Sequence, residues 1–195
     1  RTAPARRRTF GLAGADYCVV DGALHGPGGA IAEVDSMKRS LPHDLTNALA
    51  AAALVMETGL ADADAVESAL ASFVGPPHRL EHVGTWDGVA WYNDSKATTP
   101  HAAAAAIRSF ERIVLSAGGS DTHVDLAPMA ATPDRVEAVI ALGATAPAIV
   151  AAFDRVRRRE VVGDMAGAVA LAAQLAAPGS TVLLSPGCAS FDQYQ

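Results

Sequence analysis

The chain has 195 residues, of which 50% are hydrophobic and 18% charged, and its formal net charge is −6. That length allows one full-sized domain, or one domain and part of another, and the acidic balance excludes a general surface for nucleic acid. Two cysteines make no disulfide framework and no apolar run is long enough to span a membrane, so we expect a cytoplasmic protein.

Residues 1–74 are predicted to form short strands followed by two helices. The predicted strands lie at 16–20 and 30–34, and the predicted helices at 43–59 and 62–73. The strands flank "DGALHGPGGA", whose glycines predict a hairpin or a sheet edge with little room for a core of its own. Gly59 is the expected stop of the first helix and Asp62 the expected N-cap of the second. The order ββαα is that of an incomplete domain.

The stretch "GPPH" at 75–78 separates this part from a more regular one. Two prolines stiffen a short linker, so we place a domain boundary here, with domains at 1–74 and 78–195. The predicted strands of the second domain are 80–84, 88–93, 112–118, 136–143, 160–163 and 180–186. The predicted helices are 100–109, 125–131, 145–153 and 164–177. This alternation predicts an α/β fold, a mostly parallel sheet with helices on both faces and a hairpin at "TWD".

A polar turn, "NDSKATTPH", follows the strand at 88–93. Thr99 is a suitable N-cap for a helix that begins at Pro100. Free backbone N–H groups and the helix dipole favour an anion at such a start, and Lys96 adds a positive charge. Asp94 could bind a ribose hydroxyl or a metal. The alternative is a capped turn with solvated charges, and the residues alone leave both interpretations open.

Two other strand exits are rich in small or polar residues. In "SAGGSDTH", Gly118 and Gly119 would let the backbone approach a ligand closely, or would only form a tight turn. "SPGCASFDQ" carries the hydroxyls of Ser185 and Ser190, and could equally be a surface loop. Because the carboxyl ends of parallel strands meet at one edge of a sheet, we expect all three exits to share a binding edge.

Arg79 and Asn47 are candidates outside these exits. Arg79 follows the rigid "GPP" and could present its guanidinium to phosphate, or form a salt bridge in the linker. Asn47 lies one turn into a helix, where its amide suits adenine or a hydrogen bond near the cap. No zinc-binding spacing accompanies His43 or His101, and no P-loop is present.

Several stretches, in their order along the chain, resemble the Mur ligases. They are "HDLTNALAAAAL", "GPPHRLEHV", "YNDSKATTPHAA", "AGGSD" and "LLSPGCASFDQ". The resemblance covers roughly residues 9–195. It implies a Rossmann-like C-terminal domain at 78–195, preceded at 1–74 by the C-terminal tail of a central α/β ATPase domain. The family's UDP-binding domain, P-loop and magnesium ligands have no counterpart here, and the chain opens on Arg1 rather than Met, so we expect a fragment.

The "DSKAT" turn with "CASFDQ" resembles the family members that add glutamate to UDP-N-acetylmuramoyl-L-alanine in peptidoglycan synthesis. That resemblance implies that ATP phosphorylates the alanyl carboxylate and that the amine of glutamate then displaces phosphate. ATP and Mg²⁺ are the expected cofactors, small molecules the expected partners, and a monomer the expected state. The fragment alone should be inactive. The alternative from another class is a non-catalytic nucleotide-binding α/β module.

The resemblance also implies roles for individual residues. Asn47 would contact adenine, and Arg79, Asp94 and Lys96 would close on ATP, with Asp94 and Lys96 as catalytic residues. The implied glutamate-binding residues are Thr98, Thr122, Ser190 and Phe191.

One position departs from the family's pattern. A lysine usually follows the paired glycines and binds a carboxylate of glutamate, but Thr122 stands there in this chain. His123 could replace that lysine, as could an arginine from elsewhere in the protein. A changed acceptor, L-glutamate instead of D-glutamate, is the other interpretation, and the sequence leaves both open.

Overall fold

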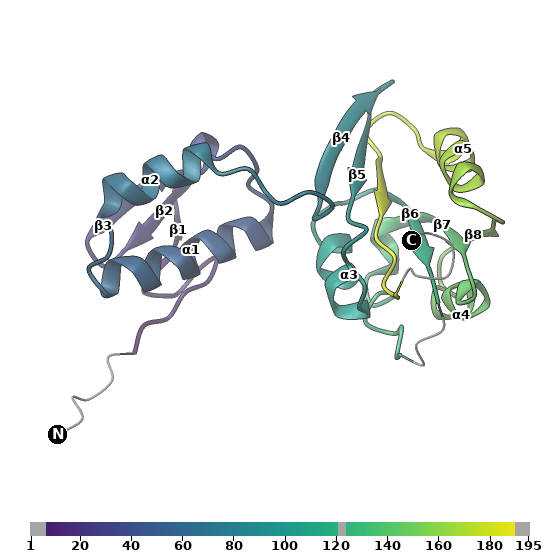
Figure 1. Ribbon diagram of the computed structural model, residues 1–195, viewed down its shortest axis with the longest axis horizontal. Coiled ribbons are helices and arrows are strands. Elements are labelled where there is room, and N and C mark those ends of the chain that lie inside the picture. The colour runs from purple at the N-terminus through teal and green to yellow at the C-terminus, as the bar shows by residue number, and fades with distance from the viewer. Residues whose placement is uncertain (1–6, 121–123, 190–195) are drawn as a thin grey trace. The chain divides into compact units, whose positions relative to one another are not determined.

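In the computed structural model, which describes residues 7–120 and 124–189, the chain divides into two units, Arg1–Val74 and Gly75–Gln195 (Figure 1). The first unit has a three-stranded sheet and the second a six-stranded sheet. Within the described ranges, no helix is long and apolar enough to cross a membrane.

The first unit holds three strands, one more than predicted. Its elements are β1 (Cys18–Val20), β2 (Ala23–Gly26), β3 (Gly29–Glu33), the 3₁₀ turn η1 (Val34–Ser36), α1 (Pro42–Glu57) and α2 (Ala63–Ser72). The glycine-rich stretch expected to be a connection contains β2, and the strands pair antiparallel in chain order. Asp21 and Gly22 both have positive φ, which suits the tight two-residue turn that folds β2 back onto β1.

The additional strand gives this unit a hydrophobic core, which the sequence analysis did not expect. Leu24 of β2 and Leu49 of α1 are fully buried, and Val66 of α2 joins the same cluster. The cluster consists of Tyr17, Leu24, Ile31, Ala32, Ala48, Leu49, Ala52 and Val66. The sheet therefore has an apolar face that both helices cover.

The predicted helix signals of the first unit are confirmed. Asp62 caps α2, because its carboxylate accepts a hydrogen bond from the N–H of Ala65 at 3.0 Å. Gly59, with a φ of 70°, follows the last turn of α1 and turns the chain away.

The second unit is the predicted mostly parallel α/β sheet. Its elements are β4 (Glu81–Trp86), β5 (Val89–Asn93), α3 (Pro100–Ile107), β6 (Ile113–Gly118), the 3₁₀ turn η2 (Pro133–Arg135), β7 (Val136–Leu142), α4 (Ala146–Ala152), β8 (Arg158–Val161), α5 (Met165–Leu175) and β9 (Thr181–Leu184). The strand order is β4-β5-β9-β6-β7-β8. Only β4 runs antiparallel, in a hairpin with β5 that turns at Asp87 and Gly88.

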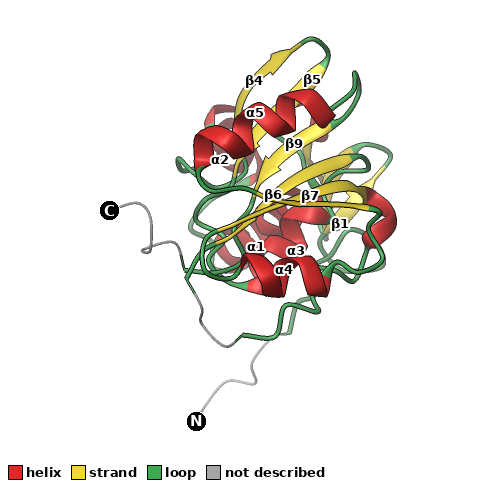
Figure 2. Cartoon of the chain, turned by 90° about the vertical axis from the view of Figure 1, so that its right-hand side faces the viewer, coloured by secondary structure: helices red, strands yellow, loops and turns green. Residues whose placement is uncertain are grey.

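Helices cover both faces of this sheet, as predicted. Figure 2 shows α5 on one side of the strands and α3 with α4 on the other. Ala168 and Ala172 of α5 pack in one cluster with Val114 and Val182 of the central strands. Alanine side chains let a helix approach a sheet closely, which explains why a chain with 5% aromatic residues still buries its core.

Two predictions about the second unit are wrong. The expected helix at 125–131 is a pair of turns, in which Met129 N–H bonds to Leu126 O and Ala130 N–H to Ala127 O. Proline at 128 lacks an N–H and another at 133 ends the segment, so an α-helix cannot grow there. Strand β8 begins at Arg158, two residues before its predicted start, because pairing with β7 rather than local hydrophobicity sets its register.

Candidate functional site

The polar strand exits converge at one edge of the large sheet, as predicted. Strands β5, β9, β6 and β7 are parallel neighbours, so their carboxyl ends lie side by side. Backbone hydrogen bonds join the exits: Asp94 N–H donates to Leu184 O at 2.8 Å, and Gly118 N–H donates to Pro186 O at 3.0 Å. In an open α/β sheet this edge is where ligands bind.

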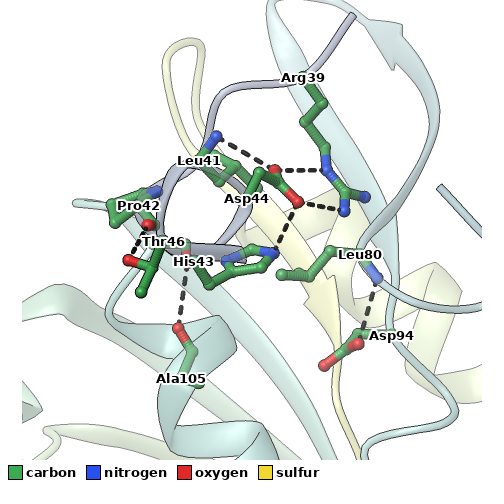
Figure 3. A network of polar contacts seen from close by, with 10 residues as sticks. Arg39, Leu41, Pro42, His43, Asp44, Thr46, Leu80, Asp94 and Ala105 are labelled. Atoms are coloured by element: carbon green, nitrogen blue, oxygen red, sulfur yellow. Dashed lines mark hydrogen bonds and ion pairs between the residues drawn. The ribbon is translucent and has the colours of Figure 1, made fainter. Parts of the chain in front are cut away.

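Asp94 is a buried residue that fastens three segments together. Its carboxylate accepts a hydrogen bond from Leu80 N–H at 3.1 Å (Figure 3) and another from the Ser185 hydroxyl at 2.8 Å. The side chain thus connects the start of β4, the turn after β5 and the loop after β9. Contact with a ribose remains a prediction.

The backbone donors of the turn after β5 are used within the protein. Asp94 N–H donates to Leu184 O, and Ser95 N–H donates to Asn93 Oδ1. Lys96 N–H donates to His78 O. Ala97 N–H donates to Asp94 O, and Thr98 N–H donates to Lys96 O. These five N–H groups are therefore not available to an anion, and the anion site at the start of α3 stays a prediction. An anion here would be attracted by the Lys96 side chain and by the dipole of α3.

The start of α3 agrees with its predicted cap. Thr99 Oγ1 accepts a hydrogen bond from Ala102 N–H at 3.3 Å, and Pro100 is the first helical residue. Immediately before this cap, Lys96 and Thr98 are both exposed. The turn therefore presents a cation and a hydroxyl to solvent on a backbone that is held in place.

Arg79 lies close to the same turn, although it precedes Asp94 by 15 residues in the chain. It is exposed, and it lies between His78, whose carbonyl accepts from Lys96 N–H, and Leu80, whose N–H donates to Asp94. The structure therefore brings together Arg79, Asp94, Lys96 and Thr98. Asn47 lies in the other unit, exposed on α1.

The paired glycines permit close approach of backbone to backbone. Gly118 has a φ of 129°, and a Cβ there would collide with the carbonyl oxygen of Leu142. A Cβ on Gly119 would collide with the carbonyl oxygen of Ala189. The glycines thus allow three strand exits to pack against one another.

Thr145, at the exit of β7, was not predicted to take part in this edge. It is buried, and its hydroxyl accepts from Gly119 N–H at 2.9 Å and donates to Gly119 O at 3.2 Å. The available signal was a threonine after the buried strand, in "ALGATAP". Thr145 holds the glycine turn in place from the neighbouring strand.

Several predicted positions cannot be placed at this edge. Thr122, Ser190 and Phe191, the remaining glutamate-binding candidates, and the alternative His123 lie outside the described residues. Within residues 7–120 and 124–189, no group of three or more His, Cys, Asp and Glu side chains could hold a metal ion.

A second polar network, also not predicted, fixes the start of α1 in the first unit. Asp44 accepts from Arg39 through both carboxylate oxygens at 2.7 Å, lies 3.2 Å from His43 Nε2, and accepts from Leu41 N–H at 3.2 Å (Figure 3). Burial alone would raise the pKa of Asp44, but the hydrogen bonds and charges of His43 and Arg39 lower it to about 2. This network anchors the helix turn that carries Asn47.

Comparison with known protein families gives a match over the second unit. Residues 78–188 match the family described as "Mur ligase, glutamate ligase domain".

Curated relatives extend this similarity into the first unit. A UDP-N-acetylmuramoylalanine--D-glutamate ligase of Symbiobacterium thermophilum is 47% identical over 161 residues, which cover 78% of this chain and 34% of the relative. A ligase of the same name from Frankia casuarinae is 38% identical, over 99% of this chain and 43% of its own length. The chain thus spans well under half the length of these relatives.

Solved structures share the fold at lower identity. MurF from Acinetobacter baumannii has a TM-score of 0.63 and 20% identity, over 90% of this chain and 42% of that protein. FolC of E. coli in complex with ADP has a TM-score of 0.63 and 22% identity, over 88% of this chain and 43% of that protein. At these identities the likeness establishes the fold alone.

Proposed function

The chain belongs to the Mur ligase family, with the glutamate ligase domain at residues 78–188, and from this premise we propose that it works as the C-terminal part of a UDP-N-acetylmuramoyl-L-alanine–glutamate ligase. The observation that carries the proposal is the 47% identity with a relative named for D-glutamate. That name favours D-glutamate as the acceptor. An L-glutamate-adding variant of the same ligase is the alternative.

We assign the first unit to the tail of a central ATPase domain and the second to a domain that closes on the nucleotide. Each unit has its own sheet and buried residues, which is what independent domains require. Pro76 and Pro77 join them, close to the expected hinge. Closure would bring the polar edge of the large sheet onto bound ATP.

The proposed reaction forms an amide through an acyl phosphate. A carboxylate oxygen of the alanyl group attacks the γ-phosphorus of ATP, and ADP leaves. The glutamate amine then attacks the acyl carbon, phosphate leaves, and the ammonium proton passes to solvent. Both steps move negative charge, so catalysis depends on positioned cations and hydrogen-bond donors.

Within this scheme Lys96 and Arg79 stabilise phosphate charge. Both are exposed cations, and the backbone hydrogen bond from Lys96 to His78 links the segments that carry them. Asp94 holds the turn and accepts from the ribose, and Asn47 of the first unit binds adenine. The residues proposed for glutamate binding are Thr98, Thr122, Ser190 and Phe191.

ATP-dependent ligases of this kind use Mg²⁺ to neutralise phosphate charge. Within residues 7–120 and 124–189, no group of three or more His, Cys, Asp and Glu side chains could hold a metal ion. We propose that the magnesium ligands belong to other parts of the ligase.

A coupled assay of ADP release by the full-length ligase tests the proposal. ADP release is expected only when UDP-N-acetylmuramoyl-L-alanine and glutamate are both present, with D-glutamate preferred over L-glutamate. No glutamate-dependent release with either isomer would disprove the ligase function. A preference for L-glutamate would support the variant ligase.

The 195-residue chain alone supplies the control. We expect this chain to be a cytoplasmic monomer without turnover. Size-exclusion chromatography measures its oligomeric state, and the same assay measures its turnover. Submillimolar binding of ATP by this chain alone would instead favour a non-catalytic nucleotide-binding module.

A further inference from the structure

The segment that carries Arg79 has an uncommon backbone. His78 has a φ of 64° and Leu80 a φ of 46°, so a left-handed residue stands on each side of Arg79. Neither is glycine, and leucine rarely adopts this conformation. Such a bend persists only where the surrounding structure holds it.

Most of the hydrogen bonds that fix this bend come from the turn after β5. Two backbone N–H groups bond across to the turn or from it: Leu80 N–H to Asp94 Oδ1 at 3.1 Å, and Lys96 N–H to His78 O at 3.1 Å. Asn93 Nδ2 contacts His78 Nδ1 at 2.9 Å. Finally, His78 N–H donates to Glu81 Oε2 at 2.8 Å. All but the last connect the bend to the turn. The bond from Asn93 reaches a side chain of the bend, the ring of His78.

The orientation of the Asn93 amide determines the state of the histidine ring. Asn93 Oδ1 accepts from Ser95 N–H at 3.0 Å, so Nδ2 must be the atom that faces His78. An amide nitrogen only donates, and His78 Nδ1 therefore accepts and carries no proton. This contact therefore corresponds to the tautomer with its proton on Nε2.

A competing contact is longer. Glu81 Oε2 lies 3.6 Å from the same Nδ1, and an ion pair between them would need a proton on that nitrogen. The two contacts exclude each other. The bond to Asn93 is shorter, and Ser95 fixes its geometry, so the structure favours Asn93 as the partner of the ring.

We propose that Asn93 is a positioning residue for ATP: by binding Nδ1 of His78, it holds the bend from which the Arg79 side chain extends. The proposal rests on the function given above, in which Arg79 stabilises phosphate. Asn93 itself need not touch the nucleotide. Without its amide the His78 ring loses an anchor, the bend is held by fewer hydrogen bonds, and Arg79 is positioned less firmly when the domain closes.

The test uses Asn93→Ala in the full-length ligase, with Thr85→Ala as the matched control. Thr85 also hydrogen-bonds a histidine ring of this hairpin, through a 3.0 Å contact with His82 Nε2, but it does not touch the bend. For Asn93→Ala we expect the KM for ATP to rise about three- to tenfold, as for the loss of one or two neutral hydrogen bonds, with the KM for glutamate unchanged. Thr85→Ala should leave both values within about twofold.

A double-mutant cycle with His78→Ala shows whether Asn93 acts through the ring. If it does, adding Asn93→Ala to His78→Ala should raise the KM for ATP by less than about twofold, because coupled residues are not additive. Additive effects, or an unchanged KM in Asn93→Ala, would overturn the proposal.

Ring ¹⁵N NMR of His78 provides a readout that does not depend on activity. The unaltered protein should show the Nε2–H tautomer at a pH at which the ring is neutral, and Asn93→Ala should show a mixture of tautomers. An Nδ1–H ring in the unaltered protein would overturn the proposed lock even if the ligase is active. Absence of glutamate-dependent ADP release with the expected tautomer would instead overturn the proposed function and leave the lock in place.

Discussion

The carboxylate of Asp94 accepts a 2.8 Å hydrogen bond from the hydroxyl of Ser185, a residue 91 positions later in the chain. Asp94 is 7% exposed and Ser185 is fully buried. Through this bond the turn after β5 and the loop after β9 share one anchor, and the other oxygen of Asp94 extends it to Leu80. The carboxylate therefore has a structural role beside the catalytic role proposed for it.

Replacing Asp94 should lower the stability of the second unit. Asp94→Ala leaves Leu80 N–H and the Ser185 hydroxyl without an acceptor, and a hydrogen bond to a charged group contributes about 1.5–3 kcal/mol. We expect the free energy of unfolding to fall by about 3 kcal/mol. Urea unfolding followed by tryptophan fluorescence measures this, because Trp86 and Trp91 both lie in the second unit. Asp154→Ala, at an exposed aspartate of that unit, is the control and should change stability by less than about 0.5 kcal/mol.

Lys96→Ala should separate activity from stability. The side chain is exposed, so its removal should leave the urea midpoint unchanged. Loss of a cation that stabilises transferring phosphate should lower kcat/KM of the full-length ligase by about 100-fold or more. Lys38→Ala changes the only other lysine of the chain, in the first unit, and should keep full activity. Normal activity in Lys96→Ala would remove this residue from the mechanism.

The network of Asp44 predicts an acid-sensitive first unit. The folded protein lowers the pKa of Asp44 from 3.8 to about 2, so its carboxylate contributes stability above about pH 4. That contribution, on the order of 2 kcal/mol, is lost as the pH falls from about 4 toward 2. Asp44→Asn should therefore be less stable than the unaltered chain at neutral pH and lose less on acidification, as measured by circular dichroism of α1 and α2. Asp35→Asn, at an exposed site of the same unit, should keep the original pH dependence.

Gly118→Ala should disrupt the packing of the strand exits. A methyl group at a φ of 129° would meet the carbonyl of Leu142, and neither backbone can move without breaking sheet hydrogen bonds. We expect a loss of more than about 2 kcal/mol in thermal unfolding of the second unit. Gly163→Ala is the matched control, because a Cβ there meets nothing within 4 Å. Equal stability of the two variants would contradict this account of the paired glycines.

Local sequence signals identified most of the elements but not all of them. The caps at Asp62 and Thr99 were predicted because N-capping depends on residues that are neighbours in sequence. Strand β2 was missed because glycines at 22, 26, 28 and 29 surround only a few apolar residues, and its pairing with β1 and β3 outweighs that weak propensity. The helix expected at 125–131 does not form, because Pro128 outweighs the helix propensity of the alanines around it.

The functional candidates also divide into residues that carry a local sequence signal and residues that do not. Arg79, Lys96 and Thr98 were found from motifs, and the described structure brings them together. Thr145 and the network of Asp44 were not found, because a lone threonine or aspartate carries no pattern. Their importance depends on partners, such as Gly119 and Arg39, that only the folded chain supplies.

The sequence by itself determined most of the strands and helices of the second unit, the polar character of the strand exits and the resemblance to one enzyme family. These features are local, or are matches read position by position. Only the tertiary structure decided that Asp94 joins Leu80 to Ser185, that the backbone donors of its turn are already used, and that Asn93 faces His78. The contact with Ser185 depends on the pairing of β5 with β9, which brings distant parts of the chain together. The contacts with Leu80 and His78 depend on the antiparallel pairing of β4 with β5.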